Sequence, residues 1–173
     1  AYRDAWVPHA ERFGFLLAVA EFSQAKYPGA AWYNFGGVMD GQGRARPREA
    51  WSFFALDRAV SALQRKAGAA EGRFALYGHS AGAQFVHRYL LLTGAPRVTR
   101  LIVANAGSYT MPDLSLPFPE GLAGPAVTAA DLRAAFGRPV TILLGEADTD
   151  PHHSSLPHQP FAEAQGWCGR LEW

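Results

Sequence analysis

The stretch that most constrains the fold of this chain is Gly78–Gly82, with the sequence Gly-His-Ser-Ala-Gly. It follows an apolar run over residues 74–77, and the residues after it repeat apolar positions at helical spacing. A strand that passes into a helix within five residues needs a sharp turn, and glycine tolerates the backbone angles of such a turn. The pattern therefore predicts a strand, a tight turn that carries Ser80, and a helix.

The rest of the chain alternates between helical and strand patterns. Apolar residues three and four positions apart predict helices, and short continuous apolar runs predict strands buried on both faces. A long loop is expected over residues 22–46, which carry five glycines and no periodicity. The expected order is a helix over 2–13, strand 15–20, helix 47–67, strand 74–77, helix 81–92, strand 98–104, a short helix opened by Thr128, and strand 140–144.

This alternation predicts an α/β fold with a parallel sheet and helices on both faces. In such sheets reactive groups gather at the carboxyl ends of the strands, where Ser80 and the segment Gly145–Asp150 both fall. The chain of 173 residues is 49% hydrophobic and 18% charged, which fits one globular domain over residues 1–173. The lone Cys168 excludes an internal disulfide.

Charge and hydropathy exclude several classes of partner. A net charge of +1 gives no reason to expect nucleic acid or an anionic surface. The longest apolar runs are too short to span a bilayer, and charged residues interrupt the N-terminal region where a signal peptide would need an apolar stretch. We therefore expect a cytoplasmic protein without a membrane partner. The sequence does not indicate its oligomeric state.

Ser80 is the candidate catalytic residue, although a serine hydroxyl stays protonated near neutral pH. To act as a nucleophile it needs a histidine base, a carboxylate that orients the histidine, and amide donors for the oxyanion. The alternative interpretation is a glycine-rich tight turn in which the serine has no chemical role.

Three segments carry a resemblance to a known family: Tyr77–Ala83, Ala104–Tyr109 and Leu143–Asp150. With them the chain resembles the α/β-hydrolase superfamily, specifically bacterial esterases related to polyhydroxybutyrate depolymerases and feruloyl esterases. The resemblance covers roughly residues 2–165 and only the middle portion of the family's fold. It implies hydrolysis of a small-molecule carboxylic ester through an acyl-enzyme on Ser80, without a cofactor or a metal.

The resemblance also implies the partners of the serine. The acid would be Asp148, just after the strand over 140–144, with Glu146 and Asp150 as rivals. The backbone N–H of Ala81 would donate to the oxyanion. The second donor is expected on a loop upstream of residue 1, with Phe35–Gly37 as a weaker substitute.

The histidine implied by the resemblance has no good candidate in the chain. His152, His153 and His158 follow the acid, but no convincing strand precedes any of them, and their spacing matches no zinc signature. His79 and His87 are expected to point away from the serine or to pack in the core. We therefore expect the histidine downstream of Trp173, and early strands upstream of Ala1. A chain lacking those strands is expected to be unstable or prone to aggregation.

Four residues are expected to shape the substrate pocket, because they lie in aromatic segments near the strand ends: Tyr33, Asn34, Asn105 and Tyr109. Two other functions stay open. An acyltransferase can carry the same Gly-His-Ser-x-Gly pattern, and a catalytically inactive relative could use the fold for binding alone.

Overall fold

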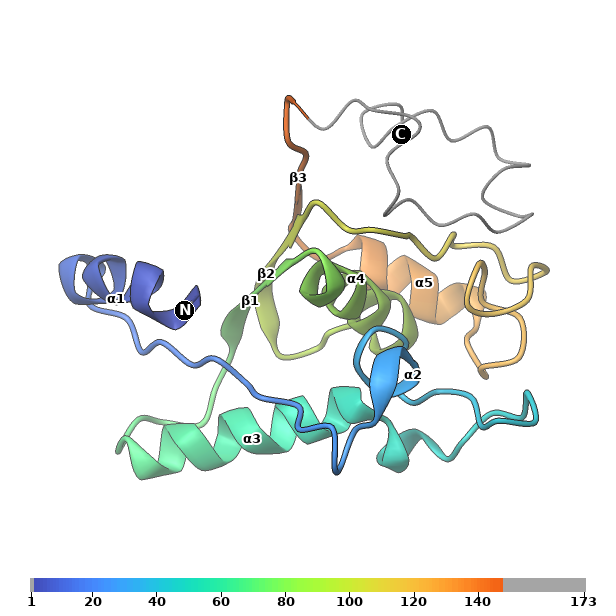
Figure 1. The fold of residues 1–173 in the computed structure, drawn as a ribbon, viewed down its shortest axis with the longest axis horizontal. Helices are drawn as coiled ribbons and strands as arrows, with labels where there is room; N and C mark the ends of the chain where they lie inside the picture. The colour runs from blue at the N-terminus through green and yellow to red at the C-terminus, as the bar shows by residue number, and fades with distance from the viewer. Residues whose placement is uncertain (1, 148–173) are drawn as a thin grey trace.

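The computed structural model describes residues 2–147, which form an open α/β arrangement (Figure 1). Predictions for Asp148, Asp150, His152, His153, His158 and Cys168 lie outside these residues. The elements are α1 (Tyr2–Phe13), α2 (Gly29–Tyr33), the 3-10 helix η1 (Arg48–Ala50), α3 (Ser52–Lys66), β1 (Phe74–His79), α4 (Ala81–Thr93), β2 (Val98–Ala104), α5 (Ala129–Phe136) and β3 (Val140–Leu143).

The three described strands form a parallel sheet in the order β1-β2-β3. Gly78 of β1 lies opposite Val103 of β2, and Ala104 of β2 lies opposite Leu143 of β3. Because the strands are parallel and in this register, their carboxyl ends meet at one edge of the sheet. Ser80 follows β1 at that edge.

Helices lie on both sides of the sheet (Figure 1). Helix α4 packs on β1 and β2, and α5 packs beside α4. On β1, successive side chains point to opposite faces, so Gly78 faces α4 while Tyr77 faces away from it. Helix α1 lies on that second side, where the rings of Trp6 and Tyr77 have their centroids 5.2 Å apart. The predicted fold class, a parallel sheet between helices, is confirmed.

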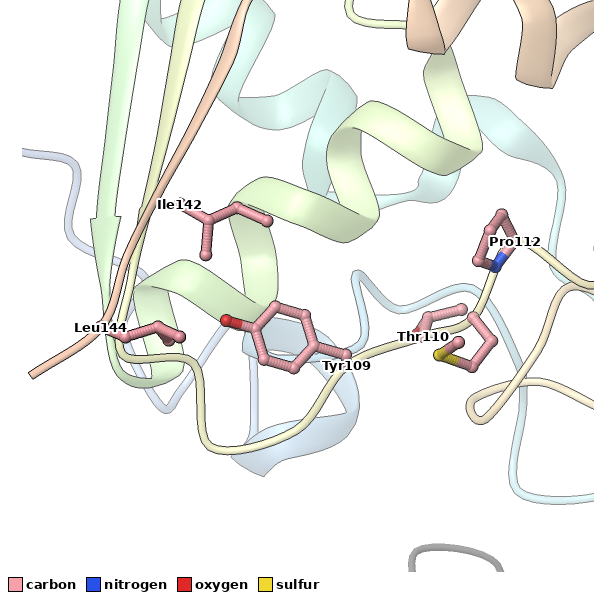
Figure 2. A pocket seen from close by; sticks show the side chains of 6 residues that line it. Tyr109, Thr110, Pro112, Ile142 and Leu144 are labelled. Atoms are coloured by element: carbon pink, nitrogen blue, oxygen red, sulfur yellow. The ribbon is translucent and has the colours of Figure 1, made fainter. Parts of the chain in front are cut away.

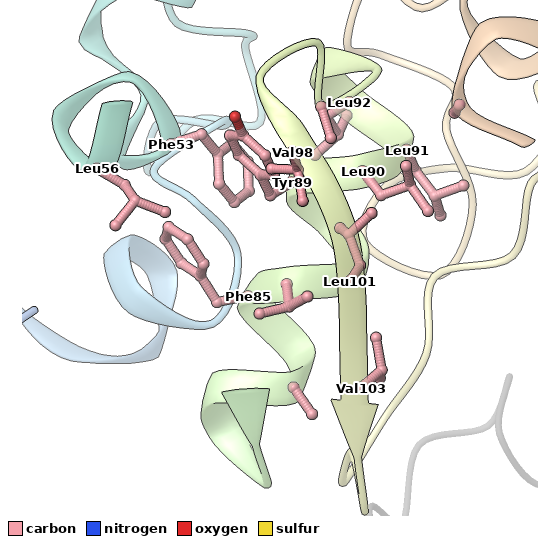
Figure 3. Packing of buried hydrophobic residues seen from close by; sticks show 14 of the residues in the cluster. Phe53, Leu56, Phe85, Tyr89, Leu90, Leu91, Leu92, Val98, Leu101 and Val103 are labelled. Carbon is pink, nitrogen blue, oxygen red and sulfur yellow. The ribbon is translucent and has the colours of Figure 1, made fainter. Parts of the chain in front are cut away.

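The hydrophobic core lies where α3, α4 and the sheet meet (Figure 3). Phe53 of α3 and Phe85 of α4 are both buried, with ring centroids 4.8 Å apart. Leu101 and Val103 of β2 are also buried. Burying side chains of this size stabilises the fold by roughly 1.5–3 kcal/mol each. This cluster holds α4, and with it the turn at Ser80, against the sheet.

The predicted buried strand over residues 15–20 is wrong. These residues form no strand, and the exposed fractions of Phe15, Leu16 and Val19 are 42%, 55% and 56%. An apolar run becomes a strand only when a neighbouring strand supplies hydrogen-bond partners, and no described strand pairs with this segment. The outer edge of β1 is likewise unpaired among the described residues.

Two other differences come from tertiary contacts. The predicted loop over 22–46 contains the short helix α2, and the predicted helix over 47–67 is divided at Trp51. Trp51 has an extended backbone with ψ 141°, its ring is buried, and its Nε1 donates to the carbonyl of Arg46. The helix therefore restarts at Ser52, because burial of the indole ring outweighs local helix propensity.

Candidate active site

Ser80 occupies a strained backbone position between β1 and α4. Its φ is 53° and its ψ is −116°, an arrangement that costs a residue with a side chain about 1–3 kcal/mol. The Ser80 amide donates a 2.9 Å hydrogen bond to the carbonyl of Ala104, so the turn is fixed to the end of β2. The side chain is exposed. The predicted strand, sharp turn and helix are confirmed.

The two glycines of the turn have unequal roles. A Cβ on Gly78 would overlap the carbonyl of Gly82 and would lie 2.7 Å from Cγ2 of Val86. A Cβ on Gly82 would meet only the Tyr33 hydroxyl, at 3.3 Å. Gly78 is therefore required for α4 to approach the sheet closely, whereas a Cβ on Gly82 would need only a small shift of the Tyr33 hydroxyl.

Ala81, the predicted oxyanion donor, is the first residue of α4. The first amides of a helix have no acceptor within the helix, so the Ala81 N–H is a donor next to Ser80. Backbone groups of the alternative donor segment Phe35–Gly37 already have other partners. The Gly37 amide donates to the Ala31 carbonyl, and the Gly36 carbonyl accepts from the Ser52 amide. Its glycines make room for side chains, since a Cβ on Gly36 would overlap the ring of Phe53.

Asn105 joins the ends of β2 and β3. Its φ of 48° lies in the left-handed region, which asparagine tolerates better than most residues. The Asn105 amide donates to Leu143 at 2.9 Å, and its side-chain Oδ1 accepts from Gly145 at 2.7 Å. The turn after β3 is thereby fixed at its start. Glu146 is exposed in that turn, and Asp148 stays a prediction.

His87 cannot serve as the base in this structure, as expected from the sequence. It is buried; its Nδ1 lies 3.0 Å from the carbonyl of Ala83, and its Nε2 accepts from the Thr110 amide at 3.0 Å. These contacts fix the tautomer with the proton on Nδ1. Burial lowers the pKa of His87 to about 3, so the ring stays neutral near pH 7.

A buried polar cluster beside the turn is centred on Arg88, whose side chain is almost completely enclosed. Its guanidinium lies 4.6 Å from the ring of Phe35 and is ringed by neutral oxygens. Burial lowers the pKa of Arg88 to about 9, which still leaves it charged near pH 7. Its hydrogen bonds run to Thr110 Oγ1 (2.8 Å), Asn34 O (3.1 Å), Gln84 Oε1 (3.2 Å) and Ser108 Oγ (3.2 Å).

Neither Arg88 nor Gln84 stands out in the sequence as a candidate site residue. The one signal is a charged side chain flanked by apolar residues on α4, which predicts burial with polar partners but does not identify them.

The predicted pocket residues lie in two places. Tyr33 stacks on Phe85, with ring centroids 5.9 Å apart, and Asn34 donates to Gln84 on α4. Tyr109 instead lines an apolar cavity of about 240 Å³ beyond the end of β3, shared with Ile142 and Leu144 (Figure 2). All of these residues lie near the carboxyl edge of the sheet, and their contact with substrate stays a prediction.

Within residues 2–147, no three His, Cys, Asp or Glu side chains come together in a way that could hold a metal ion. In the same part of the chain, no helix has the length and apolar character needed to cross a membrane.

The sequence matches no family model, and comparison with curated proteins produced no significant match. Two solved structures are similar over 95% of this chain. One is poly(aspartic acid) hydrolase-1 from Sphingomonas sp. KT-1, with a TM-score of 0.89 and 43% identity. The other is LpqC, a poly(3-hydroxybutyrate) depolymerase from Bordetella parapertussis, with a TM-score of 0.83 and 36% identity.

The chain spans 62% and 56% of the lengths of these two proteins. Both relatives are hydrolases by name, and both share the α/β arrangement described above. The resemblance inferred from Tyr77–Ala83 and its companion segments is thereby confirmed. The chain therefore has the α/β-hydrolase fold and is similar over nearly all of its length to two hydrolases, one of them a poly(3-hydroxybutyrate) depolymerase.

Proposed function

We propose that this protein is a serine hydrolase that cleaves carboxylic esters through an acyl-enzyme on Ser80. The observation that carries the proposal is the backbone of Ser80, which is held at φ 53° and ψ −116° at the carboxyl edge of the sheet. Strain of this kind persists where the surrounding structure fixes it, and it is concentrated at active sites. This backbone presents the exposed Ser80 hydroxyl beside the N-terminal end of α4.

The proposed mechanism uses three groups of this chain. Ser80 Oγ attacks the ester carbonyl, the Ala81 N–H stabilises the oxyanion, and Asp148 orients the histidine that takes the serine proton. The histidine gives this proton to the alcohol as it leaves, and a water molecule then takes the acyl group from Ser80, which releases the carboxylic acid and restores the serine hydroxyl. The printed names of the two relatives support a substrate with repeated carbonyl groups, such as a polyester or a poly(amino acid).

Labelling with a fluorophosphonate probe tests the proposal, because the probe reacts only with an activated serine. The natural protein is treated with the probe and with p-nitrophenyl esters, alongside Ser80→Ala and a matched variant at another exposed serine, Ser115→Ala. We expect labelling and hydrolysis in the natural protein and in Ser115→Ala, and neither in Ser80→Ala. Unchanged labelling of Ser80→Ala would contradict the assignment.

Two alternatives predict different products. An acyltransferase would move the acyl group to an added alcohol or thiol in preference to water, and a binding protein would do neither. Comparing acid release with transfer to an added acceptor separates the three functions.

A further inference from the structure

The side-chain amide of Gln84 is held in one orientation by three donors. Its Oε1 accepts from Asn34 Nδ2 at 3.2 Å, from Arg88 Nη1 at 3.2 Å and from Ser108 Oγ at 3.1 Å. Rotating the amide by 180° would set its NH₂ group against the guanidinium of Arg88, which has no acceptor, and against the NH₂ group of Asn34. The positions of Oε1 and Nε2 are therefore fixed by the network.

The same network leaves the Gln84 NH₂ group without a protein acceptor among residues 2–147, and the side chain is only partly buried. A Cβ on Gly107 would lie 3.0 Å from Nε2, so the donor lies against the backbone that follows β2. Ser80 follows the neighbouring strand β1 at this edge of the sheet. The Gln84 amide also donates to the Ser80 carbonyl at 3.1 Å, one helical turn away.

We infer that Gln84 is a specificity-determining residue whose Nε2 donates to an oxygen on the acyl part of the substrate. This inference rests on the proposed function, because it needs an acyl group on Ser80. One helical turn rises about 5.4 Å, so an oxygen a few bonds from the acyl carbon is within reach of Nε2. The ligand class is thus an acyl group with a hydroxyl, ether or carbonyl oxygen near the ester.

The buried charge of Arg88 explains why the donor is well suited to this role. The guanidinium polarises the Gln84 amide through Oε1, which strengthens Nε2 as a donor. Its contacts to Asn34 and Ser108 also hold the two loops on either side of α4. The donor is therefore set in place before substrate arrives, and little ordering is needed on binding.

Two p-nitrophenyl esters of equal shape test the inference: the racemic 3-hydroxybutanoate and the 3-methylbutanoate, which differ by a hydroxyl in place of a methyl group. The measured quantity is the ratio of their kcat/KM values in the natural protein and in variants. Differences in intrinsic reactivity between the esters cancel when ratios are compared. We expect the hydroxy ester to be favoured, mainly through a lower KM.

Two variants remove the donor by different routes. Gln84→Glu keeps an oxygen for Asn34, Arg88 and Ser108 but replaces the NH₂ group with an acceptor. Gly107→Ala leaves Gln84 intact and covers Nε2 with a methyl group, at a position whose φ is not in the left-handed region. We expect each variant to lower the ratio about tenfold, the size of one lost hydrogen bond, through a loss of kcat/KM for the hydroxy ester.

The matched control is Gln64→Glu on α3, where Oε1 likewise accepts from an arginine, Arg97. It should keep the ratio of the natural protein. Suppose that the natural protein is labelled at Ser80 and hydrolyses both esters, while Gln84→Glu and Gly107→Ala keep the kcat/KM ratio of the natural protein. This inference is then overturned and the proposed function stands. If the natural protein neither labels at Ser80 nor hydrolyses either ester, both are overturned. Thermal melts of each variant separate a lost contact from a lost fold.

Discussion

The Oδ1 atom of Asn105 accepts a 2.7 Å hydrogen bond from the backbone amide of Gly145, and this bond joins the ends of two neighbouring strands. Asn105 reaches this geometry with a φ of 48°. Removing the side chain would free the start of the turn that leads toward Glu146 and Asp148.

Asn105→Ala should lower the free energy of unfolding by about 2 kcal/mol, from the lost hydrogen bond and from alanine in the left-handed region. Under the proposed function it should also lower kcat at least about tenfold, because the turn that bears the acid is no longer fixed. Urea unfolding and ester hydrolysis measure the two effects. Asn105→Asp keeps the acceptor and is the control; equal kcat values for Asn105→Ala and Asn105→Asp would contradict this role.

Ser80→Gly should abolish ester hydrolysis and raise the free energy of unfolding by about 1 kcal/mol. Glycine relieves the strain at φ 53°, and its greater unfolded-state entropy offsets only part of that gain. Ser80→Ala is the control, since it removes the hydroxyl but keeps the strain. Chemical denaturation of both variants checks the difference, and equal stability of the two would argue against strain at this position.

Gly78→Ala should destabilise the fold by about 3 kcal/mol, because a methyl group there overlaps the carbonyl of Gly82 and crowds Val86. The paired variant Gly82→Ala meets only the Tyr33 hydroxyl and should change stability by less than about 1 kcal/mol. Urea midpoints measure both. Similar losses for the two variants would show that α4 does not depend on the close approach at Gly78.

His87 should make the fold weaker as the pH falls. Burial lowers the pKa of His87 to about 3 in the folded protein, below its value of about 6.5 in the unfolded chain. The unfolded state therefore binds the extra proton between these values, and stability falls by about 1.4 kcal/mol per pH unit below about pH 6.5. Unfolding free energies at pH 7 and pH 5 in the natural protein and in His87→Gln check this, with a smaller pH dependence expected in the variant.

The exposed apolar segment around Phe15, Leu16 and Val19 should make the 173-residue chain associate with itself when it is expressed alone. Replacing Leu16 and Val19 by lysine should reduce light scattering in concentrated samples. Leu114→Lys, at another exposed apolar position, is the control. A sharp, reversible melt of the unaltered chain without aggregation would contradict this expectation.

The elements that could be predicted from the sequence are those fixed by local patterns. The strand Val98–Ala104, whose apolar residues gather over 101–104, and the helix opened by the capping residue Thr128 follow the sequence prediction, and the Thr128–Asp131 capping box is present. The run over residues 15–20 has the same local pattern as a buried strand, but its structure depends on a partner strand, which local sequence does not specify.

The polar cluster could not be predicted for a related reason. Arg88 meets Asn34 across 54 residues and Ser108 across 20. Each residue alone is an ordinary polar side chain, and only the packing of α4 against two loops brings them together. The same holds for Gln84, whose fixed amide results from donors on three separate segments.

The unequal roles of Gly78 and Ser80 bear on how this protein could change over generations. Shape alone requires the glycine, whereas under the proposed function the strained serine is retained only for as long as its chemistry is needed. A lineage that gave up the reaction would gain stability by placing glycine at position 80 and would still need Gly78. Relatives with glycine at both positions should therefore be intact folds that were released from catalysis, and they would be the natural place to look for members of the superfamily that only bind.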